Sequence, residues 1–177
     1  MRASPRWPGH LLPVLLLGLA PPLGAQSPSA SIIPPDGGDS IYMAGARHPT
    51  LIMVDSSTTG SRELFAFQLA LAPGDSLPLH QHHRDDELFF IHAGEVETRI
   101  ADRKSVAVAG STLFVPAGTP VGMVNKGPQL AKAWIVFASP HMAQYIRSLG
   151  SAPGEPPRKL SPAELENIRQ RHHITFP

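Results

Sequence analysis

Residues 74–94, GDSLPLHQHHRDDELFFIHAG, place a cluster of histidines and acids between two apolar segments. The polar centre, HQHHRDDE (80–87), contains three histidines, one arginine and three carboxylates. Apolar runs bounded by turn residues are typical of buried strands, so the cluster is expected to lie between two strands. It could be a metal site, a group of catalytic bases or a charged turn, and the directions of its side chains distinguish these.

Strand geometry predicts which of these side chains point the same way. Residues two apart in a strand project to one face, so His80 and His82 share a face if LPLHQH (77–82) is extended. The chain re-enters a strand at Glu87, and a hairpin-like return would bring that carboxylate beside the two imidazoles. Two histidines and one carboxylate on one side of an ion suit iron, manganese, nickel, copper or zinc.

The residues between these strands are interpreted as a turn. A run of charged residues cannot plausibly continue a buried strand. The residues expected to be solvated are therefore His83, Arg84, Asp85 and Asp86.

Residues 41–139 repeat the pattern of short apolar runs separated by turns. The further runs are ELFAFQLALA (63–72), EVETRI (95–100), KSVAVA (104–109), TLFV (112–115) and AKAWIVFAS (131–139). Short strands at this spacing predict an all-β fold, either a sandwich or a barrel. Residues 140–177 are interpreted as a helical extension, with helices over HMAQYIRSLG (141–150) and after the capping box Ser161–Glu164.

The first forty residues are interpreted as processing and linker sequence. Residues 1–25 combine a basic start, the apolar run LLPVLLLGLA (11–20) and a small residue, Ala25, which is typical of a cleavable signal peptide. The run is too short for a stable membrane span. Residues 26–40 are rich in Pro, Ser and Gly and predict an extended arm. The expected location is periplasmic or secreted.

The composition restricts the chemistry. Lys plus Arg number 15 against 14 acids, so no basic excess indicates a nucleic-acid partner. The chain has nine histidines and no cysteine. A metal would therefore be held by nitrogen and oxygen ligands, without thiolates.

Two motifs resemble those of the cupin family. The first is the spacing of Gly74, His80-Gln81-His82, Glu87 and Gly94, and the second is GSTLFVPAGTPVGMVN (110–125). The segments SIYMAG (40–45), DDELFFIHAGEV (85–96), VPAGTP (115–120) and HMAQYIRSLG (141–150) look more narrowly like small single-domain cupins of the quercetin dioxygenase-like type. The resemblance implies a single jelly-roll β-barrel over 41–139 with a metal inside, often paired as a homodimer.

One position departs from the family pattern. The second motif normally supplies a third histidine where this chain has Val121. His80, His82 and Glu87 carry over as metal ligands, and valine cannot coordinate. The site could bind metal through three ligands, could have lost affinity and bind small molecules only, or could recruit Met123, for which core packing is the favoured interpretation.

The resemblance leaves two functions open. As an enzyme, the protein would be a metal-dependent, dioxygenase-like oxidoreductase on a small organic substrate, with Glu87 as the catalytic base. Its pocket would be lined by Phe89, Phe114, Val121 and Met123. The alternative is a non-catalytic cupin that binds a small molecule or a metal. A purely structural barrel is disfavoured by the complete set of two histidines and one glutamate.

Overall fold

The computed structural model describes residues 28–177. The expected signal peptide, residues 1–25, lies outside this range. Residues 28–38 contain no helix or strand, and β1 begins at Asp39, two positions before the predicted start of the barrel. No helix among the described residues is long and apolar enough to cross a membrane.

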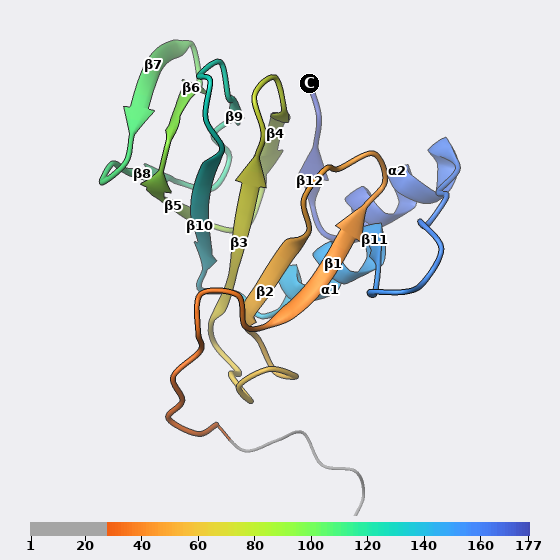
Figure 1. Cartoon of the computed structure of the whole chain (residues 1–177). Helices are drawn as coiled ribbons and strands as arrows, with labels where there is room; N and C mark the ends of the chain where they lie inside the picture. Colours follow the sequence, from red (N-terminus) through yellow and green to blue (C-terminus); the bar gives the residue numbers. More distant parts are fainter. Residues whose placement is uncertain (1–27) are drawn as a thin grey trace, which may run out of the picture.

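The larger of two antiparallel sheets has seven strands in the order β11-β1-β2-β3-β10-β5-β8 (Figure 1). These strands are β1 (Asp39–Met43), β2 (Thr50–Val54), β3 (Phe65–Leu71), β5 (Glu87–Ala93), β8 (Thr112–Val115), β10 (Ala131–Phe137) and β11 (Gly150–Ser151). Side chains of β10 alternate strictly between buried and half-buried, as expected of a strand with one face on a core.

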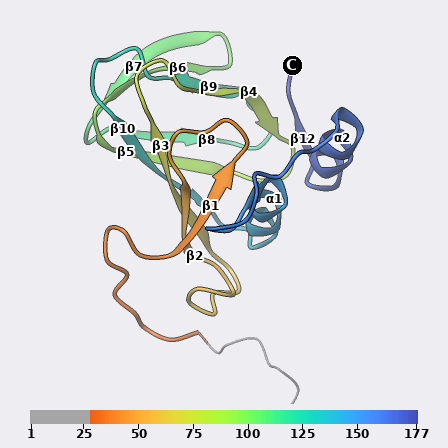
Figure 2. The ribbon, with the colours of Figure 1, turned by 45° about the vertical axis from the view of Figure 1, so that its right-hand side comes forward.

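The smaller sheet has five strands in the order β12-β4-β9-β6-β7. These are β4 (Ser76–His82), β6 (Glu95–Ile100), β7 (Arg103–Val108), β9 (Val121–Val124) and β12 (Ile174–Thr175). Figure 2 shows β4, β9 and β6 in one layer, facing β5, β8 and β10 in the other. The apolar core, which includes Phe65, Phe89, Ile91, Val121 and Ile135, lies between them.

The expected closed barrel is therefore corrected to two facing sheets with jelly-roll connections. The chain turns sharply from the larger sheet to the smaller one at Gly94, which lies between β5 and β6 and has a positive φ of 70°. A Cβ atom there would lie 2.8 Å from the Cα of Ala131, so only glycine fits this crossing.

The C-terminal extension is built into both sheets. Helix α1 (His141–Leu149) leads into β11, and α2 (Pro162–Arg171) leads into β12. The predicted capping box is present, because Glu164 N–H donates to Ser161 Oγ and the Glu164 carboxylate accepts from Ser161 N–H. Helix α1 is held to the β1–β2 layer by Arg147, whose guanidinium donates to Asp55 at 2.8 Å and to Asp39 at 2.6 Å. Strand β1, before the boundary expected at residue 140, and strand β11, after it, thus belong to the same sheet.

Candidate metal centre

Strand β4 presents two imidazoles to the interior. His80 and His82 are both buried, and the intervening Gln81 is more exposed, which is the alternation predicted from the sequence. The two rings lie 5.0 Å apart, centroid to centroid, and are nearly perpendicular. The ring nitrogens of both histidines can therefore reach one point on the inner side of the smaller sheet.

The opposite sheet supplies the carboxylate. Glu87 is the first residue of β5, and its side chain is buried. Its Oε2 lies 3.9 Å from Nε2 of His80 and 3.8 Å from Nε2 of His82. One ligand atom from each of the three residues lies within 4.8 Å of the others. The predicted convergence of two imidazoles and an acid is confirmed.

A backbone contact orients His80. Its Nδ1 lies 2.9 Å from the carbonyl oxygen of Pro78. A carbonyl can only accept, so Nδ1 carries the proton and Nε2 has a free lone pair directed toward the other ligand atoms. Metal-bound histidines are commonly oriented in this way through their second nitrogen.

Two other buried atoms of the group have no hydrogen-bond partner among the described residues, namely Nδ1 of His82 and Oε2 of Glu87. An unpartnered buried polar atom costs about 1–3 kcal/mol. A proton or a cation beside Oε2 would offset that cost.

Burial controls the protonation of the group. It raises the pKa of Glu87 to about 8, with a smaller contribution from the negative charge of Asp85. Burial also lowers the pKa of His82 to about 3, assisted by the charges of neighbouring histidines, and lowers the pKa of His80. Without a cation, the three groups are therefore neutral near pH 7, and their close approach is not an ion pair.

The donor set fits a transition metal. Nitrogen and oxygen ligands bind such ions at about 2.0–2.2 Å, which places ligand atoms about 3–4 Å from one another. The separations of 3.8 and 3.9 Å between Oε2 and the two Nε2 atoms lie in this range, and the whole set, which spans up to 4.8 Å, would contract slightly around an ion. The donors suit iron, manganese, nickel, copper or zinc and do not discriminate among them.

Val121, where the resemblance to cupins implies a third histidine, lies beside His80. Val121 pairs directly with His80 across β4 and β9, and it is 0% exposed. Opposed residues of an antiparallel pair share a face, so Val121 adds an apolar wall where a fourth ligand would stand. Met123 and Phe89, which are expected to line a pocket, are both buried in the core.

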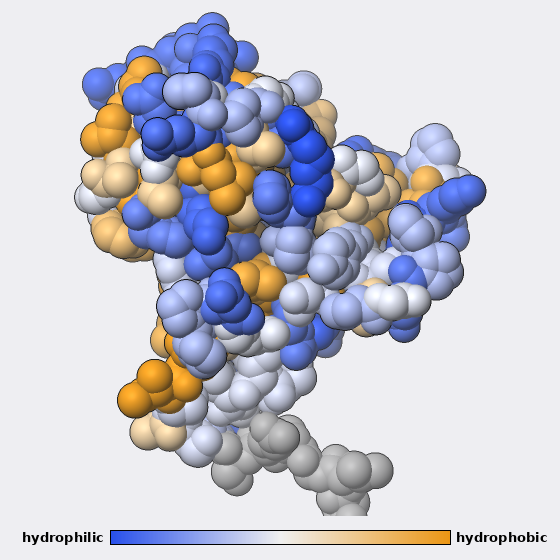
Figure 3. Space-filling model, in the orientation of Figure 1, coloured by the Kyte–Doolittle hydropathy of each residue, from blue (hydrophilic) through white to orange (hydrophobic). Residues whose placement is uncertain are grey.

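Phe114 does not join them. It is 61% exposed, and its neighbours Leu113 and Val115 are buried. The prediction that Phe114 lines the pocket is wrong, because the alternation of β8 directs its ring to solvent. Figure 3 shows hydrophobic surface over the region of β7 and β8.

Asp85 corrects a second expectation. The sequence predicts a solvated turn residue there, but Asp85 is only 7% exposed and its Oδ2 lies 3.2 Å from Nε2 of His141. The ring of His141 in turn stacks on His172 at 6.1 Å. The turn before Glu87 therefore lies against α1 and α2, although Asp85 Oδ2 and His141 Nε2 are not aligned for a hydrogen bond. No sequence pattern indicates this contact, because it joins segments distant in the chain.

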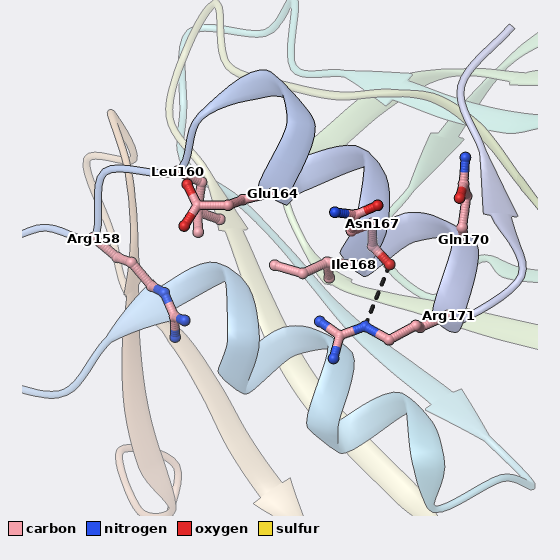
Figure 4. Close-up of a pocket in the computed structure, with 7 residues that line it drawn as sticks. All are labelled: Arg158, Leu160, Glu164, Asn167, Ile168, Gln170 and Arg171. Atoms are coloured by element: carbon pink, nitrogen blue, oxygen red, sulfur yellow. Dashed lines mark hydrogen bonds between the residues drawn. The ribbon is translucent and has the colours of Figure 1, made fainter.

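Two cavities lie elsewhere. One, of about 530 Å³, is an open groove along α2 lined by Arg158, Leu160, Glu164, Asn167, Ile168, Gln170 and Arg171 (Figure 4). The other, of about 480 Å³, lies beside Gly94 and Pro128. Neither is lined by His80, His82 or Glu87, so they are separate from the candidate metal centre.

Comparison with known proteins gives a family match for part of the chain. Residues 67–137 match the model of the cupin domain. No curated protein matches the chain.

Several solved structures are similar to part of the chain. A predicted oxalate decarboxylase from Thermotoga maritima aligns with a TM-score of 0.50 and 19% identity, over 58% of this chain and 92% of that one. KdgF from Halomonas sp. aligns with a TM-score of 0.45 and 20% identity, over 51% of this chain and 77% of that one. A protein of Thermus thermophilus aligns with a TM-score of 0.43 and 29% identity, over 45% of this chain and 75% of that one.

Proposed function

From the premise that residues 67–137 form a cupin domain, we propose that the protein binds a divalent transition metal through His80, His82 and Glu87 and oxidises a small organic substrate in a dioxygenase-type reaction. The observation that carries the proposal is the convergence of three buried donor atoms from two different sheets.

A bound ion of this kind would supply a Lewis-acid centre with open positions for small molecules. The protein would contribute the surroundings. The bond from His80 to the Pro78 carbonyl holds one imidazole in place. Val121, Met123 and Phe89 exclude water from the interior side.

Glu87 is the candidate proton acceptor. The pKa of about 8 describes the metal-free carboxyl, and a bound ion would displace its proton and leave a carboxylate. The carboxylate oxygen that does not hold the ion would then accept a proton from the bound substrate. A substrate with an acidic hydroxyl, such as an enol or a phenol, fits this base and the apolar walls.

A second function is favoured by Val121. An apolar residue in place of the family's third histidine removes one coordinating group, and the same interior would then bind a small molecule or a metal without turnover. The two functions share the ligand residues and differ in oxygen chemistry.

The test combines metal analysis with oxygen uptake. Protein purified without chelator is analysed for metal, loaded with each candidate ion and then screened with flavonols and other enols in an oxygen electrode. Stoichiometric metal with substrate-dependent uptake, lost in His80→Ala and retained in Phe114→Ala, supports the enzyme. Metal without uptake supports the binding protein. Absence of metal binding after loading would overturn the enzyme and leave small-molecule binding as the remaining function.

Two further properties are proposed on sequence grounds. We propose export after cleavage behind Ala25, which N-terminal sequencing of the protein recovered from cells and culture fractions would test. We also propose a homodimer, because exposed sheet edges tend to pair, and β7 and β8 end the two sheets. Light scattering on the eluting protein measures its mass.

A further inference from the structure

The C-terminal residues lie along the strand that carries both histidines. Strand β12 pairs antiparallel with β4, with Ile174 opposite His82 and Thr175 opposite Gln81. The backbone N–H of His83 donates to the carbonyl of His173 at 3.0 Å. Figures 1 and 2 both show the C-terminus beside β4. The last residues of the chain therefore form the edge of the smaller sheet next to the candidate metal centre.

The penultimate residue contacts a proposed ligand directly. The ring of Phe176 stacks on the imidazole of His80, with centroids 5.7 Å apart and planes inclined by 27°. The guanidinium carbon of Arg169, on α2, lies 4.0 Å from the centre of the Phe176 ring. Phe176 is half-buried and packs against the core. These contacts hold an aromatic ring over His80.

The three proposed ligands are almost inaccessible. The side chains of His80, His82 and Glu87 are 7%, 6% and 3% exposed. A small organic molecule therefore reaches them only if some neighbouring element moves. Strands β9 and β10 each pair with a strand on both sides, so moving either one breaks a sheet.

The terminal segment is much easier to move. Strand β12 has two residues and pairs with one strand only, so its opening would break few sheet hydrogen bonds and expose one core side chain, Ile174. A short edge strand opens at a lower free-energy cost than a central strand.

We propose that residues 172–177 form a movable cover over the candidate metal centre and that Phe176 determines which molecules reach His80. The role of the cover in substrate access rests on the proposed function. The cover itself can be tested in metal-free protein. Release of the segment removes the ring from His80 and leaves a space bordered by that imidazole and by Arg169.

The main test measures the reactivity of His80 in metal-free protein. Diethyl pyrocarbonate modifies accessible imidazoles, and peptide mass spectrometry assigns the modified histidine. In Phe176→Ala, modification of His80 should be about five- to tenfold faster than in the wild type, since opening no longer limits access. Phe176→Leu should lie between the two. Phe114→Ala, which removes the same ring from an exposed position, should match the wild type.

A second measurement needs no variant. Amide hydrogen exchange of wild-type residues 173–176 should be at least about tenfold faster than that of β10, whose amides lie within the sheet. Equal protection of the two segments would overturn the cover, as would an unchanged His80 rate in a folded Phe176→Ala protein. Neither readout involves a metal, so failure of metal binding would contradict the proposed function and leave the cover standing.

The metal-loaded protein gives a third readout. Transfer of the ion to an excess of chelator should be about fivefold faster or more in Phe176→Ala, with the same stoichiometry before chelation. A rate equal to that of Phe114→Ala would contradict the role of Phe176 in access.

Discussion

His80 and Val121 stand directly opposite each other across β4 and β9, and both side chains are buried. A donor introduced at position 121 would therefore enter the same interior face as His80. This relationship makes the departure from the family pattern directly testable.

Val121→His should raise metal affinity at least about tenfold, or about 1.4 kcal/mol, because it adds a fourth nitrogen or oxygen ligand to the set. Isothermal titration with zinc or nickel measures the change. Val124→His is the matched control, since Val124 ends the same strand on the other face and pairs with Ser76 and Glu97. Equal effects of the two substitutions would mean that position 121 does not face the ligands.

Metal affinity should depend steeply on pH. Because the pKa of Glu87 is about 8, an ion that binds its carboxylate must displace a proton below that pH. Affinity should rise about tenfold per pH unit from about pH 6 to pH 8 and then level off. Titrations in buffers of different ionisation enthalpy should show about one proton released per ion. Glu87→Gln should abolish both the pH dependence of metal affinity and the proton release. A wild-type affinity that does not change with pH would contradict the prediction.

The stability of the metal-free protein should fall as the pH rises. A carboxyl with a raised pKa in the folded state stabilises fully below its unfolded value, and that contribution is lost as the pH approaches the folded value. His82, with its lowered pKa, acts in the opposite direction below about pH 6.5. His80, His92 and His172 also have lowered pKa values and act in the same direction as His82, and this effect fades above about pH 7.5. Between about pH 7.5 and 9 the titration of Glu87 dominates, and the free energy of unfolding should drop by roughly 0.5–1 kcal/mol.

Urea unfolding in the presence of chelator measures this change. Glu87→Gln, which cannot ionise, should show little dependence over the same interval. A wild-type stability that increases over that interval would show that the carboxyl of Glu87 is not buried in its protonated form.

The contact between Asp85 and His141 should contribute to stability. His141→Ala removes the imidazole that lies 3.2 Å from the buried carboxylate of Asp85 and should lower the free energy of unfolding by about 1 kcal/mol. Lys126→Ala breaks the exposed pair with Glu97 and should have a smaller effect. Equal losses in the two variants would mean that burial of the Asp85 carboxylate does not strengthen its contact with His141.

The two phenylalanines predicted for the pocket should behave differently. Phe89 is fully buried, so Phe89→Ala should destabilise the protein by about 3–5 kcal/mol through lost burial and a cavity. Phe114→Ala should change stability by less than about 0.5 kcal/mol, as is usual for an exposed position. Thermal and urea unfolding of both variants would check that the ring of Phe114 lies in solvent and that of Phe89 in the core.

Local periodicity is sufficient to predict the ligand group. The alternation of His80 and His82 along one strand, and the return at Glu87, depend only on neighbouring residues. The capping box at Ser161 is predictable for the same reason. Each of these features requires a few adjacent residues and no knowledge of distant segments.

Features that depend on distant pairing escape such a prediction. Asp85 looks like a solvated acid until α1 brings His141 against it. The pairing of Ile174 with His82 joins segments almost a hundred positions apart, and a two-residue strand carries no periodic signal. Sheet closure likewise depends on how all strands are registered, so the strand pattern alone leaves a sandwich and a barrel open, and the two sheets appear only in the structure.

The ligand residues straddle the two layers, since both histidines belong to the smaller sheet and Glu87 to the larger. An ion held there would act as an interlayer cross-link in a chain that has no cysteine to form a disulfide. The tethered residues are near neighbours in the chain, so little loop entropy would be removed from the unfolded state. The increase in stability would come instead from binding of the ion to the folded form only. It would grow with the logarithm of the free ion concentration. Resistance of this protein to unfolding would then follow the metal supply of its surroundings.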